Sequence, residues 1–262
     1  MRLALAVASS PPAHSGPATD NYLLAPAGRL AWREPDGEKV ISREGAGVAV
    51  AVADGAGSGP QAEVAARAGV RALARLLDGH SSGTGVDRLH RFLIEAHRRM
   101  QRRAGSDAAS VGTGVALCWS PAGGRRVCWA EIGTPRALLV RDGAASWLGL
   151  DGAGMAVRQR WISGDPALDG ALRIELGVNV SSVELALGDR LVLMTDGAWH
   201  HISPRRLAWL CASQPDADRL AEACESYVRE AGGQDAASVA VLAVDSDASI
   251  RGDAPPVRGQ TP

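Results

Sequence analysis

Residues 47–59 read GVAVAVADGAGSG, an apolar run that ends in an aspartate and a glycine-rich turn. Small and β-branched residues in such a run are typical of a buried strand, and the glycines that follow are typical of a tight loop. The period then changes, because apolar residues recur at helical spacing between Pro60 and Leu77. The sequence therefore predicts a strand, a functional-looking turn and a helix in direct succession.

The same patterns, read outward from this stretch, predict blocks of strands separated by pairs of helices. The N-terminal MRLALAVASS has an apolar core too short for a secretory signal, so we expect an edge strand there. In chain order, the other predicted elements are a helix at 87–103, a meander of antiparallel strands at 111–150, strands at 181–187 and 190–199, helices near 204–213 and 216–231, and a strand at 237–245.

Helices kept apart from a largely antiparallel β region indicate an α+β fold in packed layers and argue against a doubly wound parallel sheet. One domain covering residues 1–245 is the best division of the 262-residue chain. Residues 246–262 carry no core-forming pattern, so we expect a disordered C-terminal tail.

Composition excludes several classes of protein. Hydrophobic residues make up 46% and charged residues 22%, which is typical of a globular chain and unlike a disordered one. A net charge of −1 offers no basic field for nucleic acid, and no apolar run is long enough to span a membrane. The four cysteines form no CxxC pair, so we interpret them as buried free thiols of a cytoplasmic protein.

Acidic residues stand where predicted apolar strands begin or end. Asp54 and Asp196 follow apolar strands, Asp235 precedes the last one, and Asp20 lies in the N-terminal ATDNYLL segment. Any one of them alone is more often a turn residue. Strands packed side by side would bring the four carboxylates together, where their repulsion is unfavourable unless a cation lies among them. Such hard oxygen ligands suit Mg²⁺ or Mn²⁺.

Five strings resemble, in order and spacing, the motifs of the metal-dependent protein phosphatases of type 2C (the PPM family). They are VADGAGSGPQAEVAARAG, VGTGVAL, EIGTPRALLV, LALGDRLVLMTDGAWHHIS and QDAASVAVLAV. The DGAGS motif and the opening PPAHSGPATDNYLL also resemble a bacterial subgroup. The resemblance spans roughly residues 8–245 and implies a four-layer α-β-β-α sandwich, in which two packed, mainly antiparallel sheets are flanked by helices.

The resemblance also implies the site. Asp54 matches the carboxylate that bridges two metal ions, and the Gly55 carbonyl matches a ligand of one of them. Asp196 and Asp235 match the remaining carboxylates, and Asp20 matches an acidic residue that acts through metal-bound water. With two Mn²⁺ or Mg²⁺ ions bound, an acidified water would attack the phosphorus of a phosphomonoester in line.

The chain departs from the family pattern at several positions. Ser15 stands where the family commonly has a phosphate-binding Arg, and the neighbouring His14 is a candidate replacement. Thr134 replaces an Asp that helps to hold a third metal in many members, and Ala236 replaces the Asn of a closing Asp-Asn pair. Ala56 stands where eukaryotic members often carry His. The binuclear core is kept while its surroundings differ.

The leading hypothesis is a cytoplasmic protein serine/threonine phosphatase that uses a two-metal-activated water. Phosphorylated proteins would be its substrates and a Ser/Thr kinase its cognate partner, with no role for nucleic acid or membrane. One alternative is a pseudophosphatase that keeps the fold as a regulatory binding module, and another is a hydrolase of small phosphorylated metabolites. His200 and His201 follow the TDG turn closely, and a surface or packing role is favoured for both.

Overall fold

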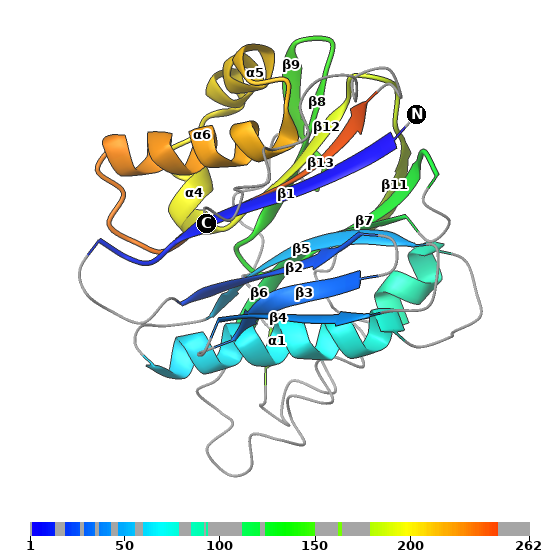
Figure 1. Ribbon diagram of the computed structural model, residues 1–262, viewed down its shortest axis with the longest axis vertical. Coiled ribbons are helices and arrows are strands. Elements are labelled where there is room, and N and C mark those ends of the chain that lie inside the picture. Colours follow the sequence, from blue (N-terminus) through cyan, green and yellow to red (C-terminus); the bar gives the residue numbers. More distant parts are fainter. Residues whose placement is uncertain are drawn as a thin grey trace, which may run out of the picture.

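The chain folds around two antiparallel sheets that pack face to face (Figure 1). The computed structural model describes residues 2–13, 19–26, 29–34, 37–42, 47–55, 60–78, 85–91, 93, 112–120, 124–149, 162–163 and 179–245. In the described part every strand pair is antiparallel. The strands predicted at 111–150 are present as β6 to β9 at 112–147, but they do not form one meander: β6 pairs with β7 in the larger sheet, and β8 pairs with β9 in the smaller one.

The smaller sheet has five strands. Their order is β1 (Arg2–Ser10), β13 (Ala237–Asp245), β12 (Arg190–Met194), β8 (Arg136–Arg141) and β9 (Ala144–Trp147). The N-terminal segment is the edge strand that the sequence predicts, and it pairs with β13 from Arg2↔Asp245 to Ser10↔Ala237.

The larger sheet has eight strands. Their order is β11 (Asn179–Glu184), β7 (Arg126–Ile132), β6 (Gly112–Ser120), β5 (Val48–Gly55), β2 (Asp20–Ala25), β3 (Arg29–Glu34) and β4 (Gly37–Ser42), while β10 (Ile162–Ser163) also pairs with β6. Strand β5 lies in the interior of this sheet, between β2 and β6.

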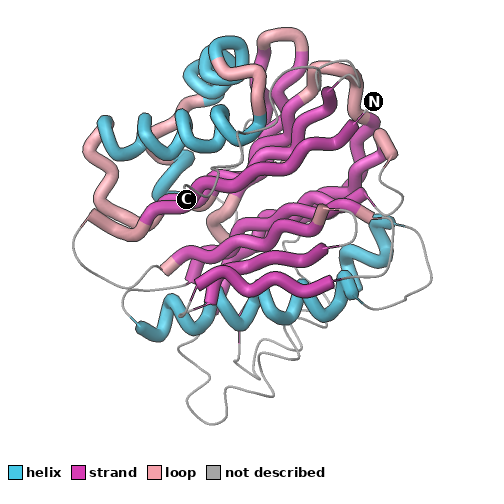
Figure 2. Tube along the Cα trace, in the orientation of Figure 1, coloured by secondary structure: helices cyan, strands magenta, loops and turns pink. Residues whose placement is uncertain are grey.

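Helices cover the outer faces of both sheets (Figure 2). Helix α1 (Pro60–Asp78) packs on the larger sheet, and α5 (Pro204–Ser213) and α6 (Ala217–Glu230) pack on the smaller one. Side chains at their N-caps fix where the last two begin: Ser203 accepts from the amide of Arg206, and Asp216 accepts from the amide of Arg219. The predicted four-layer α-β-β-α sandwich is confirmed.

Alternate side chains of β5 belong to two different hydrophobic cores. Its alanines at 49, 51 and 53 join the core beneath α1, while Val50 and Val52 join the core between the sheets. Small residues let the helix approach the strand closely, and branched residues fill the wider space between the sheets. A run buried on both faces reads as continuously apolar, which is why the sequence shows no polar alternation here.

Most predicted helices are confirmed within a residue or two of their ends. The expected helix at 87–103 is seen at 85–91 and 93, and its remainder lies outside the described residues, as does the tail at 246–262. The strand predicted at 190–199 is too long: β12 ends at Met194, and a single helical turn, α4 (Asp196–Trp199), follows it. None of the helices in the described part is long and apolar enough to cross a bilayer.

Candidate metal-dependent active site

Two buried carboxylates meet on neighbouring strands of the larger sheet. Asp20 is the first residue of β2, Asp54 is the penultimate residue of β5, and the antiparallel register pairs them directly. Their exposed fractions are 3% and 7%. Across a ladder, directly opposite residues place their Cβ atoms only about 5 Å apart. Sequence positions 34 residues apart therefore become a carboxylate pair.

The smaller sheet supplies two more carboxylates at the same end of the sandwich. Asp196 follows β12 and begins α4, where its side chain accepts from the amide of Gly197 at 2.8 Å. Asp235 precedes β13 and accepts from the amide of Ala236 at 2.8 Å. Asp196 is half-buried and Asp235 is exposed. Each carboxylate is thus held by its own turn, and both act electrostatically on Asp54.

Crowding of these acids shifts their pKa values upward. Burial raises the pKa of Asp54 to about 7, helped by the charges of Asp196 and Asp235. Burial also raises the pKa of Asp20 well above its ordinary value, with Asp54 as the next cause, and burial followed by the charge of Asp235 raises that of Asp196. Negative charge therefore accumulates where these carboxylates meet.

Two threonines that the sequence analysis did not select as site residues orient the buried pair. The hydroxyl of Thr134 donates to Asp54 Oδ2 at 2.5 Å, and that of Thr195 donates to Asp20 Oδ2 at 2.6 Å. Thr195 also accepts from the amide of Ser238 at 2.9 Å, which ties the smaller sheet to the larger one through Asp20. Thr134 occupies the position where the family pattern has an acid, and here its hydroxyl contacts Asp54 directly.

Backbone packing at the site leaves no room for side chains at two glycines. A Cβ on Gly55 would lie 1.9 Å from the carbonyl oxygen of Ala62 in α1, and one on Gly197 would lie 2.0 Å from that of Ala236. Real Cβ atoms do not approach backbone so closely, so both positions require glycine. The amide of Gly55 donates to the carbonyl of Thr19 at 2.9 Å, which holds the end of β5 against the start of β2.

The donor set fits a hard divalent cation. Its oxygen atoms come from carboxylates and a strand-end carbonyl, with no thiol or imidazole among them, as Mg²⁺ and Mn²⁺ prefer. The raised pKa values show that the negative charge is not balanced by protein groups. Among the described residues, no three Asp, Glu, His or Cys side chains are spaced as ligands of one ion. The structure thus gathers the predicted carboxylates at one end of the sandwich without forming a finished coordination sphere.

Two histidines follow the TDG turn, and a third is the candidate for binding phosphate. His200 is exposed and its ring lies 4.0 Å from that of Trp199, while its charge lowers the pKa of Asp196, so it faces the edge of the site. His201 is half-buried. The candidate phosphate-binding residue His14, together with Ser15 and Ala56, lies outside the described residues.

Solved structures share this fold at low identity. A serine/threonine phosphatase from S. agalactiae matches with a TM-score of 0.71 and 16% identity, over 93% of this chain and 100% of that one. The Mycobacterium tuberculosis serine/threonine phosphatase PstP/Ppp matches with a TM-score of 0.68 and 20% identity, over 94% of this chain and 100% of that one. The phosphatase domain of the cell-fate determinant SpoIIE from Bacillus subtilis matches with a TM-score of 0.55 and 15% identity, over 97% of each chain.

Sequence comparison assigns the family. No curated protein matches the chain. The family model described as Stage II sporulation protein E (SpoIIE) matches residues 44–244, which include β5 with Asp54, the TDG turn with Asp196 and nearly all of β13. The match covers well over half of the chain, and the PPM fold is present throughout it. The chain belongs to the SpoIIE family, whose domain is a phosphatase domain of the PPM type.

Proposed function

We propose that this chain is a metal-dependent protein serine/threonine phosphatase that uses two Mn²⁺ or Mg²⁺ ions. The observation that carries the proposal is the meeting of Asp20 and Asp54 on paired strands with Asp196 and Asp235 at the same end of the other sheet. Repelling carboxylates at the ends of buried strands reduce stability, so their presence together calls for a positive ligand. Structures of the same fold are known with two manganese ions for PstP and with magnesium for RsbX.

Each acidic residue has a distinct place in the proposed site. Asp54, whose pKa is raised by both Asp196 and Asp235, would be a ligand of the ions together with the Gly55 carbonyl. Asp196 and Asp235 would supply the remaining carboxylate ligands, and Asp20 would act through water. Two bound cations supply Lewis acidity and lower the pKa of a water that attacks phosphorus in line.

The threonines keep the carboxylates in position for that role. Because Thr134 Oγ1 donates to Asp54 Oδ2, the orientation of that carboxylate is restricted. Thr195 does the same for Asp20 and is itself fixed by the amide of Ser238. Hydrogen bonds of this kind set the orientation of a ligand before the ion arrives, which reduces the reorganisation needed on binding.

The substrate class and the cellular setting follow from related proteins and from the chain's own chemistry. The structures named above are of serine/threonine phosphatases, so phosphorylated proteins are the substrates we propose, with a Ser/Thr kinase as the cognate partner. All four cysteines are free, and burial raises the pKa of the Cys118 and Cys224 thiols, which suits a reducing cytoplasm. His14 remains our candidate for binding the substrate phosphate.

Hydrolysis of an aryl phosphate by metal-stripped protein tests the proposal. We expect turnover with added Mn²⁺ or Mg²⁺ and none with EDTA, and we expect a phosphoserine or phosphothreonine peptide to be hydrolysed as well. Turnover in EDTA would refute the two-metal reading. No turnover with any divalent ion, in protein that still unfolds cooperatively, would favour the regulatory binding module. Hydrolysis of small phosphorylated metabolites but of no phosphopeptide would overturn the assignment of proteins as substrates.

A further inference from the structure

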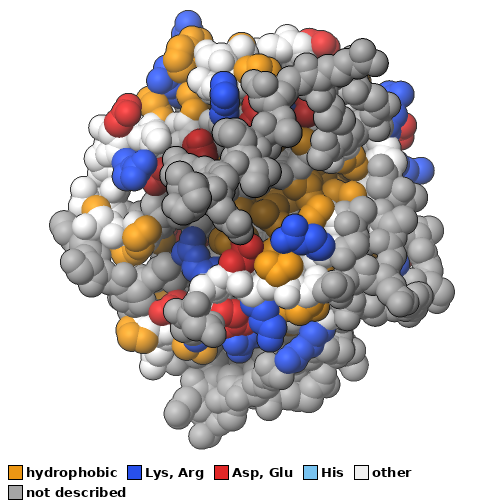
Figure 3. Space-filling model, in the orientation of Figure 1, with side chains coloured by type: hydrophobic (Ala, Val, Ile, Leu, Met, Phe, Trp, Pro, Cys, Tyr) orange, Lys and Arg blue, Asp and Glu red, His pale blue; other side chains and the backbone are white. Residues whose placement is uncertain are grey.

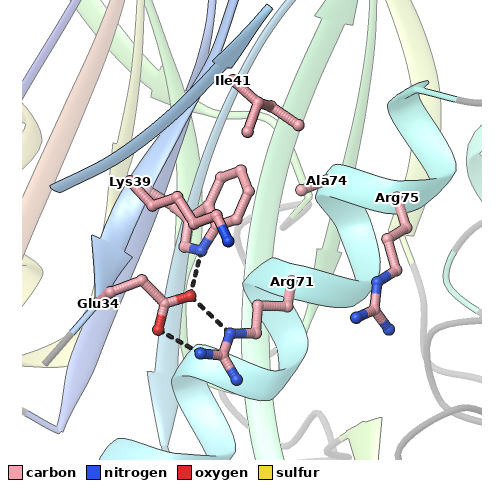
Figure 4. A pocket seen from close by; sticks show the side chains of 7 residues that line it. Glu34, Lys39, Ile41, Arg71, Ala74 and Arg75 are labelled. Carbon is pink, nitrogen blue, oxygen red and sulfur yellow. Dashed lines mark hydrogen bonds and ion pairs between the residues drawn. The ribbon is translucent and has the colours of Figure 1, made fainter.

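A cavity lies between α1 and the β3–β4 hairpin, on the α1 side of the larger sheet, whereas Asp20 faces the smaller sheet (Figure 4). Its volume is about 270 Å³. Its walls combine an apolar floor with charged side chains at the rim, and the lining residues are Trp32, Glu34, Lys39, Ile41, Arg71, Ala74 and Arg75. In Figure 3, blue side chains gather over this part of the molecule, where α1 and the hairpin lie, with red and orange ones among them.

Among the described residues that line the cavity, the one carboxylate is already neutralised. Glu34 has a side chain only 6% exposed, and it accepts two hydrogen bonds from Arg71, one of them from Nε at 2.6 Å. It accepts a third from Trp32 Nε1 at 2.6 Å, and Arg67 lies 3.9 Å away. Two side-chain bonds from Arg71 and Trp32 lower the pKa of Glu34 against the effect of burial, so it stays ionised as the partner of Arg71. The remaining charge of the cavity is therefore positive.

The cationic groups retain capacity for a ligand. A guanidinium has five N–H donors, and the contacts of Arg71 with Glu34 use its Nε and Nη2 atoms while its side chain is 40% exposed. Lys39 is the only lysine in the chain, and its ammonium lies 5.8 Å from the centre of the Trp32 ring. Figure 4 shows Lys39 and Arg71 approaching the cavity from the hairpin and the helix respectively.

The cavity opens beside a free strand edge. Strand β4 ends the larger sheet, and no strand in the described ranges pairs with its outer side. Exposed edges of this kind accept an extended peptide as an added strand, with alternate side chains entering pockets on one face. Lys39 and Ile41 of β4 lie two residues apart on the face that lines the cavity, as strand alternation requires.

We propose that this cavity binds an acidic segment of a partner protein, in which a carboxylate side chain and an apolar one lie two residues apart and so point to the same face of an added strand. The carboxylate would contact Lys39 and the outer donors of Arg71, and the apolar side chain would pack on Trp32 and Ile41. A volume of about 270 Å³ suits one or two side chains, since pockets for drug-sized ligands start at about 300 Å³. Charge complementarity and the neighbouring strand edge favour a peptide over a free small molecule.

A matched pair of blocked peptides tests the proposal on the intact protein. The probes are acetyl-Leu-Ser-Glu-Ser-Leu-amide and its analogue with Gln in place of Glu, titrated to millimolar concentration against ¹⁵N-labelled protein. We expect the Glu peptide to shift the amide signals of residues 38–41 and the Trp32 indole signal, and the Gln peptide to bind several-fold more weakly. Lys39→Gln should weaken the Glu peptide about fivefold, as an ion pair of ~1 kcal/mol implies.

The control variant is Arg219→Gln, which removes an exposed cation on α6, remote from the hairpin. It should bind the Glu peptide like the parent, and added salt should weaken binding in both. The proposal is overturned by the absence of shifts in residues 38–41, by equal binding of the two peptides, or by unchanged affinity in Lys39→Gln. None of these readouts depends on phosphatase activity, so the outcome is independent of the proposed function.

Discussion

Replacing Asp196 by asparagine separates a ligand role from a structural role, because the two roles give opposite results. Burial, and then the charge of Asp196, raise the pKa of Asp54 to about 7. A carboxyl group with an ordinary pKa near 3.8 that titrates near 7 in the folded protein costs roughly 4 kcal/mol of stability above pH 7. Asp196→Asn keeps the size of the side chain and removes one of the causes of that shift.

The sign of the effect depends on pH. The folded state binds the Asp54 proton more tightly than the unfolded state does, so the associated stability is complete below about pH 4 and is lost as the pH rises through 7. Without metal, we therefore expect Asp196→Asn to be more stable than the parent near pH 8, by ~1–2 kcal/mol. The free energies of unfolding of the two proteins should become similar near pH 4, where the carboxyl groups are protonated.

Urea unfolding of metal-stripped parent and variant at both pH values measures this difference. Adding Mn²⁺ should then stabilise the parent more than the variant, and hydrolysis of an aryl phosphate by the variant should fall by orders of magnitude. If Asp196 is only a turn residue, its replacement should instead lower stability and leave activity unchanged. If Asp196→Asn loses the same stability at both pH values and hydrolyses phosphate at the parent rate, the proposed role of Asp196 is wrong, and the two-metal reading falls with it.

Three further changes test other parts of the structure. Gly55→Ala should destabilise the fold by more than ~2 kcal/mol in urea unfolding, because its Cβ would meet a backbone carbonyl at 1.9 Å, whereas Gly124→Ala, with open space around it, should not. Asp189→Asn should lower the free energy of unfolding by ~1–2 kcal/mol at pH 7, because it removes the charge of a buried carboxylate that is paired with Arg141. The Arg141 bonds lower the pKa of Asp189, so that difference should shrink as unfolding is measured at pH 3. Deleting residues 249–262 should leave the melting temperature and activity unchanged; a large loss of either would show that they dock.

The strands and helices were predictable where the pattern had a clear period. The continuous apolar run of β5 and the helical spacing from Pro60 onward are local properties, and both elements formed as expected. The N-terminal strand was predictable because its apolar stretch was too short for a signal sequence. Helix α4 was missed because four residues are too few to show a period.

The sequence indicates the acids of the candidate site but not their surroundings. Asp54 and Asp196 end apolar strands, which is visible in one sequence, but the register that sets Asp20 against Asp54 is a property of the assembled sheet. The hydroxyls of Thr134 and Thr195 carried no signal of their own, because threonine is common in and near strands. Their role appears only when the two sheets are placed together.

Thr195 shows how the fold and the site depend on the same contact. Its amide donates to the carbonyl of Ser238 and its hydroxyl accepts from the amide of Ser238, which fixes the ends of β12 and β13. The same hydroxyl donates to Asp20 on the other sheet. A buried carboxylate of raised pKa at this point weakens the packing of the sheets, while its hydrogen bond to Thr195 lowers that cost. Asp20 is therefore held apart from solvent by the junction that it destabilises, and a cation that binds the acids would strengthen the contact between the two sheets as well as complete the site.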